Sequence, residues 1–325
     1  MNVDPLYLFS NQSNIPEFIL SSVTFVYEVR LLLFMTFTVV YISTILGNGV
    51  IVLIIQLDVR LQTPMYFFLT NLSFLDIFYS SVTVPKLLDI LLADNRRISF
   101  DSCILQMYLF HVLASSEMFL LTAMAYDRYV AICNPLRYAA LMRREVRLPL
   151  GACAWFGGFI HSTFHTAFIL RLSFCGPNHM DNFFCDATPL IKLSCSDTRL
   201  DEIMLTVTPG ILGPSCFMMV FLSYGYIIRS ILKIKSREGR RKTFSTCASH
   251  LMVISIFYGT GIIVYLQPMS VYSSANRFIT VFYAVITPML NPIIYTLRNK
   301  DVKGAMQKLL LHQRVVQKSN IVTVS

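Results

Sequence analysis

Seven long apolar runs constrain this chain more than any other feature of its sequence. Each can supply the roughly 20 apolar residues that a helix needs to cross a bilayer. We place them at about residues 31–56, 64–92, 100–133, 147–169, 203–232, 245–266 and 276–297. The runs lack the alternation of barrel strands, so helices must satisfy their backbone groups in lipid. With 55% hydrophobic and 14% charged residues, we expect an all-α membrane protein, a seven-transmembrane helix bundle.

Charged residues between the runs set the orientation of this bundle. The segments that we place in the cytoplasm contain 18 Lys and Arg residues and four acids. The segments that we place outside contain seven Lys and Arg residues and ten acids. Positive charge is enriched on the cytoplasmic side of membrane proteins. We therefore expect an extracellular N-terminal tail (1–30), a transmembrane domain (31–298) and a cytoplasmic end (299–325). The net charge of +9 forms no uniform basic face, so no nucleic-acid partner is expected.

Both ends of the chain carry local patterns. Asn11-Gln12-Ser13 matches the acceptor pattern for N-glycosylation at Asn11. Beyond the seventh run, residues 299–311 alternate apolar side chains with lysines; the apolar ones are Val302, Ala305, Met306, Leu309 and Leu310. This pattern predicts a short amphipathic helix after helix seven that lies on the anionic inner leaflet, with membrane lipid as its partner.

Four cysteines fall in outer segments or at the outer start of the third run: Cys103, Cys175, Cys185 and Cys195. Disulfides form readily on the extracellular side. Four cysteines allow three pairings, and their positions alone do not choose among them. A zinc site is the alternative use of these side chains. The others (Cys133, Cys153, Cys216 and Cys247) fall in or at the ends of apolar runs, where cysteine acts as a small buried apolar residue.

Two acids, Asp76 and Glu117, lie deep within the second and third runs. Ionisable groups at such a depth must face the bundle interior and find a partner, a proton or a cation. Asn48 and Asn291 can complete the same polar cluster. A structural hydrogen-bond network with one protonated acid is the alternative to a cation site.

The outer halves of runs three, five, six and seven are candidates for a ligand pocket. Side chains spaced i, i+3, i+4 and i+7 share one helix face. The candidates are Met107, Phe110, His111, Ala114, Ser115 and Met118 on the third run, Met204, Val207, Thr208 and Ile211 on the fifth, Tyr258, Gly261, Ile262 and Tyr265 on the sixth, and Val281 on the seventh. This mostly apolar lining favours a small, largely apolar ligand held by one or two hydrogen bonds. Helix packing is the alternative interpretation for each residue.

Two further patterns limit the ligand and metal chemistry of the bundle. No acid lies on the third-run face outward of Glu117, which argues against a cationic amine ligand. His161 and His165 have the i, i+4 spacing that can hold a metal. No third ligand is evident beside them, so the sequence does not favour a metal site there.

An Asp-Arg pair, Asp127-Arg128, ends the third run just before a basic stretch. A carboxylate beside an Arg at a helix terminus can restrain the guanidinium until a partner competes for it. The surrounding ten residues, 124–133, resemble the end of the third helix in olfactory receptors, which are rhodopsin-like (class A) G-protein-coupled receptors. Further stretches match the same family in order: residues 64–73, Ser223-Tyr224, residues 242–251 and residues 288–295. The sequences of residues 64–69 and 81–86 resemble those of the tetrapod-type (class II) group of olfactory receptors.

The resemblance implies an odorant receptor of the plasma membrane that crosses the membrane several times. It implies disulfides Cys103–Cys185 and Cys175–Cys195, and a sodium ion or protons held around Asp76 and Glu117. It implies binding of a small volatile ligand and activation of a heterotrimeric stimulatory G protein, which raises cAMP. The residues that it assigns to activation and G-protein coupling are Asp127, Arg128, Tyr129, Tyr224, Asn291, Pro292 and Tyr295.

The chain departs from rhodopsin-like receptors at Tyr258, where many of them carry Trp in a Cys-Trp-x-Pro switch. Tyr258 has no Pro nearby, as in other olfactory members, so the usual toggle of the sixth helix is not expected in that form. Two other classes of protein compete with the receptor interpretation. A transporter or channel would also use intramembrane acids, but the chain shows no internal repeat or continuous polar path. A membrane enzyme would need a nucleophile–base set, which we do not find, so no catalytic residues and no cofactor beyond sodium are expected.

Overall fold

Helices occupy the described part of every predicted run in the computed structural model, which describes residues 17–21, 26–175, 178–265, 282–298 and 301–308. The long helices are α1 (Tyr27–Leu57), α2 (Pro64–Ala93), α3 (Phe100–Cys133), α5 (Arg144–Ile169), α7 (Arg199–Leu232) and α8 (Arg237–Tyr265). A π-helical segment, Phe282–Ile286, leads into α10 (Thr287–Arg298). Within the described ranges, α1, α2, α3 and α7 are long and apolar enough to cross a membrane by length and composition alone.

The two remaining long helices are more polar for reasons visible in their sequence. Helix α5 begins with Arg144, Glu145 and Arg147, and α8 begins with a basic turn at Arg237. Proline does not end the apolar helices. Helix α2 starts at Pro64, where the missing N–H costs nothing, and runs through Pro85 to Ala93.

Shorter helical segments join the long ones. They are the 3-10 turns Val59–Leu61 and Pro135–Arg137, with α4 (Tyr138–Leu141) and α6 (Ala187–Lys192). Residues 301–308 are helical, with Val302 and Ala305 buried and Lys303 and Lys308 exposed. The described part of the predicted tail helix is therefore amphipathic; Leu309 and Leu310 lie outside the described residues, as does Asn11.

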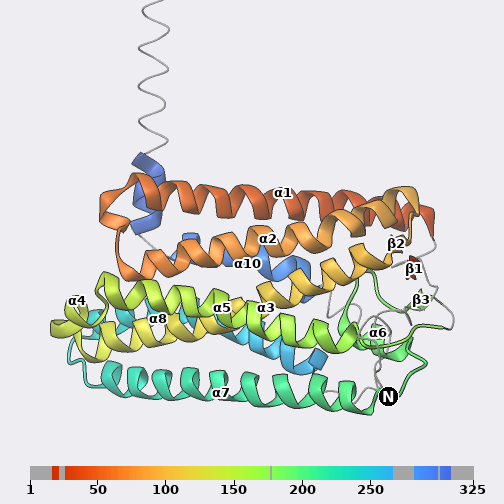
Figure 1. The fold of residues 1–325 in the computed structure, drawn as a ribbon. Coiled ribbons are helices and arrows are strands. Elements are labelled where there is room, and N and C mark those ends of the chain that lie inside the picture. The colour runs from red at the N-terminus through yellow and green to blue at the C-terminus, as the bar shows by residue number, and fades with distance from the viewer. Residues whose placement is uncertain (1–16, 22–25, 176–177, 266–281, 299–300, 309–325) are drawn as a thin grey trace, which may run out of the picture.

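A small sheet at one end of the bundle departs from the purely helical expectation. Strand β1 (Glu17–Leu20) pairs antiparallel with β2 (Arg97–Ser99), Phe18 facing Ile98, and parallel with β3 (His179–Met180), Ile19 facing His179. The three strands and α6 gather at one end, whereas α4 lies at the other (Figure 1). Strands of two to four residues carry no readable periodicity, so their pairing depends on the helices that bring them together.

Exposed apolar side chains cover the outer faces of the bundle. On α1 they recur every seven residues at Leu32, Val39, Leu46 and Leu53, and α7 exposes a further set that includes Met218, Phe221 and Leu222. A soluble protein rarely exposes so large an apolar surface. These faces fit contact with lipid. Cys153 on α5 is exposed in the same way, so the prediction that it is buried is wrong.

Helix α3 lies at the centre of the bundle and packs against α2, α5, α7 and α8. Helix α5 approaches α3 closely at Gly158, where an added Cβ atom would clash with Ser116 Oγ and lie 2.5 Å from the Val112 carbonyl oxygen. Trp155 of α5 also donates to Asn71 Oδ1 of α2 at 3.1 Å. These contacts hold α3 in the position from which its side chains form the candidate site.

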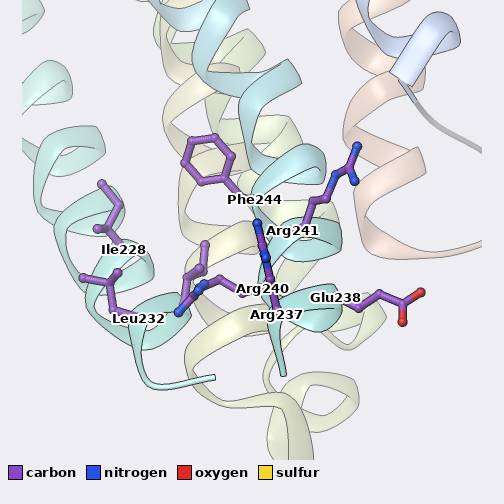
Figure 2. A pocket seen from close by; sticks show the side chains of 8 residues that line it. Ile228, Leu232, Arg237, Glu238, Arg240, Arg241 and Phe244 are labelled. Carbon is purple, nitrogen blue, oxygen red and sulfur yellow. The ribbon is translucent and has the colours of Figure 1, made fainter. Parts of the chain in front are cut away.

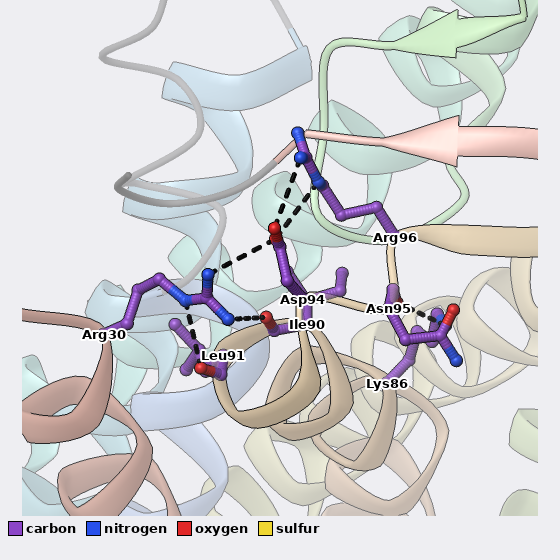
Figure 3. Close-up of polar contacts among 7 residues, drawn as sticks. All are labelled: Arg30, Lys86, Ile90, Leu91, Asp94, Asn95 and Arg96. Atoms are coloured by element: carbon purple, nitrogen blue, oxygen red, sulfur yellow. Dashed lines mark hydrogen bonds and ion pairs between the residues drawn. The ribbon is translucent and has the colours of Figure 1, made fainter. Parts of the chain in front are cut away.

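Arg30 ties the adjoining ends of α1 and α2 (Figure 3). Its guanidinium donates to the carbonyl oxygens of Leu91 at 3.1 Å and Ile90 at 3.3 Å, which belong to the last turn of α2. It also lies 3.5 Å from a carboxylate oxygen of Asp94, whose left-handed conformation (φ 54°) ends that helix. Arg96 approaches the same carboxylate at 3.1 Å. Arg30 therefore satisfies carbonyl groups at the end of α2 and balances the charge of Asp94.

Candidate functional site

Asp76 on α2 and Asn291 on α10 form the centre of a buried polar core. Asn291 Nδ2 donates to both carboxylate oxygens of Asp76, at 2.9 and 3.1 Å, and both side chains are almost fully buried. Asn48 on α1 donates to the carbonyl oxygens of Thr44 and Pro288, at 3.1 and 3.2 Å. The core therefore joins α1, α2 and α10 through hydrogen bonds that helix packing alone would not supply.

Several oxygen atoms in this core have no hydrogen-bond partner among the described residues. They are Asn48 Oδ1, Asn291 Oδ1 and Glu117 Oε1, and Glu117 is buried on α3. Carboxylate and amide oxygens are the ligands that hard cations prefer. No group of three or more His, Cys, Asp or Glu side chains within the described ranges could hold a metal ion. Unpartnered oxygens of this kind can accept from a protonated group or contact a cation.

Arg128 is held by its own neighbour at the end of α3. Its Nε donates to Asp127 Oδ2 at 3.0 Å, and its Nη2 contacts the same oxygen. Tyr138 of α4 donates to the other oxygen, Oδ1, at 2.8 Å. Burial, followed by the charge of Asp127, raises the pKa of Tyr138, which keeps its hydroxyl protonated as a donor. Both carboxylate oxygens of the buried Asp127 thus accept hydrogen bonds, and Asp127 restrains the Arg128 guanidinium.

Tyr224 on α7 pairs with His250 on α8 through a 2.7 Å contact between its hydroxyl and His250 Nδ1. Tyr295 Oη on α10 has no hydrogen-bond partner among the described residues. Arg128, Tyr224 and Tyr295 are therefore not joined by hydrogen bonds in this conformation. Tyr129 makes ring contacts with Tyr126 and Tyr226, at centroid distances of 6.4 and 5.8 Å.

Sequence reasoning missed two residues that contact the residues assigned to activation: His250, beside Tyr224, and Tyr138, beside Asp127. His250 lies in the matched stretch 242–251, so its position in a family motif was the available signal. Tyr138 follows α3 by five residues in a connecting segment, where no periodicity marks it. Its role depends on a turn that brings it back beside Asp127.

Two disulfides close the end of the bundle that carries the sheet. Cys103 at the start of α3 is bonded to Cys185, and Cys175 is bonded to Cys195. These are the pairs that the family resemblance implies. Gln106 of α3 reinforces the first link, because its side-chain oxygen accepts from the Cys185 N–H at 3.0 Å. The segment between α5 and α7 is thereby fixed over the third helix.

The ligand candidates on α3 lie on the part of this helix that the segment between α5 and α7 covers. Met107, Phe110, His111 and Ser115 are buried, and Ala114 and Met118 are partly buried. The Phe110 ring packs against Phe184 of the covering segment at a centroid distance of 4.7 Å, and against Tyr79 of α2 at 5.0 Å. The predicted face is therefore continuous and mostly apolar, and the structure does not test whether it contacts a ligand.

A histidine cluster, defined as His111, His161 and His165, adds polar groups to this face. Ser115 Oγ contacts His161 Nδ1 at 2.8 Å, and the His165 ring centroid lies 4.4 Å from that of His161 and 6.3 Å from that of His111. One ring nitrogen of each histidine has no hydrogen-bond partner among the described residues. Sequence spacing relates His161 to His165 but does not relate either to His111 on another helix.

The candidates on the other helices are placed less uniformly. Met204 and Thr208 of α7 are partly buried, whereas Val207 and Ile211 are 43% and 64% exposed. No described residue therefore covers the side chains of Val207 and Ile211, and their contact with a ligand stays a prediction. On α8, Tyr258 is buried and packs against Phe217 at 5.5 Å, and Gly261 is partly buried. The side chains of Ile262 and Tyr265, and all of Val281, lie outside the described residues.

Lipid-facing helices, a buried polar core and a restrained arginine define the chain as a multi-pass helical membrane protein. The sequence profile of the olfactory receptor family matches residues 37–313, and the chain belongs to that family. Olfactory receptor 4E2 of Mus musculus is 49% identical over 299 residues, which cover 92% of this chain and 96% of that receptor. Olfactory receptor 10G6 of Homo sapiens is 46% identical over 305 residues, covering 94% and 92%.

Proposed function

We propose that this olfactory receptor binds a small, mostly apolar volatile molecule against the buried α3 face and signals through a stimulatory G protein. The observation that carries the proposal is the face itself: Phe110 and Met107 are buried beneath a disulfide-tied segment, with Ser115 and the histidine cluster beside them. Such a lining combines an apolar wall with a few polar anchors, as small-molecule pockets do.

The polar anchors favour a ligand with one hydrogen-bonding group. The free ring nitrogens of the histidine cluster can donate or accept, according to tautomer. Asp186 lies 3.4 Å from His111 Nε2, but the same oxygen already accepts from the Ala187 N–H at 2.8 Å. On the α3 face outward of Glu117 no acid is present to pair with an ammonium group, so we expect alcohols, aldehydes, ketones or esters to bind better than amines.

Signalling would use the Asp127–Arg128 pair. Release of Arg128 from Asp127 frees a guanidinium at the end of α3, next to Tyr224 and Tyr295 by family analogy. The basic segment Lys233–Lys242 offers contact surface for the G protein, and cAMP rises when the stimulatory subunit engages adenylyl cyclase. Ligand binding shifts the population toward this released form.

The topology belongs to the same proposal. The chain spans the membrane seven times, with residues 1–30 outside, Asn11 glycosylated and the helix at 301–308 against the inner leaflet. The charge difference between the two sets of connecting segments supports this orientation. Asp76 and Glu117 hold a sodium ion or protons. Thermal unfolding of the purified receptor in sodium chloride and in choline chloride distinguishes sodium from protons. If the site holds sodium, the melting temperature should be higher in sodium chloride than in choline chloride; if it holds protons, the two should agree.

A cAMP assay in cells tests the function. Cells expressing the parent chain are screened against volatile compounds beside Arg128→Ala, Ser115→Ala and the control Arg143→Ala, at matched surface expression. We expect Arg128→Ala to abolish the response and Ser115→Ala to shift its midpoint roughly fivefold or more, the worth of about one hydrogen bond. Arg143 is exposed beyond the site, so Arg143→Ala should respond normally. A response that persists in Arg128→Ala, or a ligand-gated current without G protein, would favour a channel instead.

A further inference from the structure

An open groove lies between α7 and α8 (Figure 2). It is at the ends of these two helices that are remote from the sheet (Figure 1). Its volume is about 870 Å³, within the usual range for a small-molecule site. Aliphatic side chains of α7 form one wall and the first two turns of α8 form the other. The lining residues are Ile228, Ile231, Leu232, Arg237, Glu238, Arg240, Arg241 and Phe244.

The charges in this groove are predominantly positive. The lining contains one acid, Glu238, and three arginines, Arg237, Arg240 and Arg241. All four side chains are exposed. The ion pairs found among the described residues involve none of these arginines. In Figure 2 the Arg240 side chain extends toward Leu232, whereas Arg241 and Glu238 point away from the α7 wall. The groove therefore presents guanidinium groups that can bind a phosphate through paired hydrogen bonds.

The apolar wall distinguishes the groove from a purely ionic surface. Ile228, Leu232 and Phe244 are 47%, 68% and 54% exposed, and they continue the apolar surface of α7. In a membrane, that surface faces acyl chains, and the arginines at its edge lie at the level of the headgroups. One occupant with both a phosphate and an acyl chain would match both walls.

We propose that this groove binds an anionic phospholipid whose headgroup carries a phosphate monoester, with its acyl chain along Leu232 and Phe244. The site rests on the proposed orientation, which places this end of the bundle at the inner leaflet, where anionic lipids are concentrated. These arginines also belong to the segment 233–242 that we propose as contact surface for the G protein. The exposed apolar side chains of the groove, Ile228, Leu232 and Phe244, continue the lipid-facing surface of α7 and favour a lipid as the occupant of the groove itself.

Direct lipid binding to the full-length receptor tests the site without any odorant response. The purified receptor is reconstituted in nanodiscs of phosphatidylcholine containing a headgroup-labelled phosphatidylinositol bisphosphate, or phosphatidylserine at matched total charge. The groove variant combines Arg240→Gln and Arg241→Gln. The control combines Arg143→Gln and Arg144→Gln, which removes the same charge from exposed residues outside the groove. Equal melting temperatures establish that both variants are folded.

We expect the parent and the control to prefer the inositol bisphosphate lipid, and the groove variant to bind it roughly tenfold more weakly. Soluble inositol polyphosphate should bind the parent much more weakly than the lipid does, because it lacks the acyl chain. Three results would overturn the proposal. They are an equal loss in the control, equally tight binding of the soluble headgroup, and unchanged lipid binding with reduced G-protein coupling in the groove variant. The last result would assign the groove to the G protein.

Discussion

Asn291 on α10 donates from one side-chain nitrogen to both carboxylate oxygens of Asp76 on α2, at 2.9 and 3.1 Å. The two residues are 215 positions apart in the chain, and both are buried. A hydrogen bond to a charged or strongly polar group in such a setting is costly to break, because the remaining partner cannot turn to water. This pair therefore fixes α10 against the bundle.

Asn291→Ala should destabilise the receptor by about 1–3 kcal/mol, because it leaves the buried Asp76 carboxyl without its donor. The measurement is thermal unfolding of the purified receptor in detergent. Asn291→Ala combined with Asp76→Ala removes both groups, so the double variant should lose less stability than the sum of the two single variants. Additive losses would show that the two side chains do not act as a pair.

Tyr138→Phe should raise basal cAMP signalling in cells. The change removes the donor to Asp127 Oδ1 at 2.8 Å and weakens the hold of Asp127 on Arg128. A loss of about 1 kcal/mol shifts the population of the released form roughly fivefold. Tyr126→Phe is the control, because Tyr126 is exposed on α3 and donates nothing to Asp127. Basal signalling that stays at the parent level in Tyr138→Phe would exclude a restraining role for this hydroxyl.

Gly158→Ala should lower the yield of folded receptor and its melting temperature. The added Cβ atom would lie 2.5 Å from the Val112 carbonyl oxygen, which belongs to the backbone and cannot turn aside. Such overpacking costs about 1–3 kcal/mol. Gly49→Ala is the matched control, because nothing lies within 4 Å of the added atom. If both variants melt at the same temperature, α5 can move away from α3 without loss.

The apolar runs predicted the helices well because lipid leaves the backbone few alternatives. The limits of α2 and α3 agree with the predicted runs within a residue or two, and Pro85 stays inside α2. Spacing also identified the buried face that contains Met107, Phe110 and His111. Period and length are local properties, so a single stretch of sequence carries them.

Contacts between distant segments could not be predicted in the same way. The strand pairing of Phe18 with Ile98 and the approach of His111 to His165 depend on how separate helices and loops meet. Tyr138 is a similar case, since a turn after α3 brings it to Asp127. The family resemblance supplied the cysteine pairing for which the sequence left three choices. It did not supply the histidine cluster.

Arg30→Gln should destabilise the junction of α1 and α2, whereas Arg97→Gln should have little effect. The side chain of Arg30 is 13% exposed; it donates to two carbonyl oxygens at the end of α2 and lies 3.5 Å from Asp94. Arg97 also pairs with an acid, Glu17 at 3.1 Å, but its side chain is 72% exposed. Water and salt screen the exposed Arg97–Glu17 pair, so its loss costs at most about 1 kcal/mol of stability. Removing the partly buried Arg30 guanidinium also leaves two carbonyl groups without a donor, which costs about 1–3 kcal/mol. Thermal unfolding of both variants in low and high salt measures the difference. Equal shifts in the two variants would mean that Arg30 acts as a surface charge and that the α2 carbonyl groups find other donors.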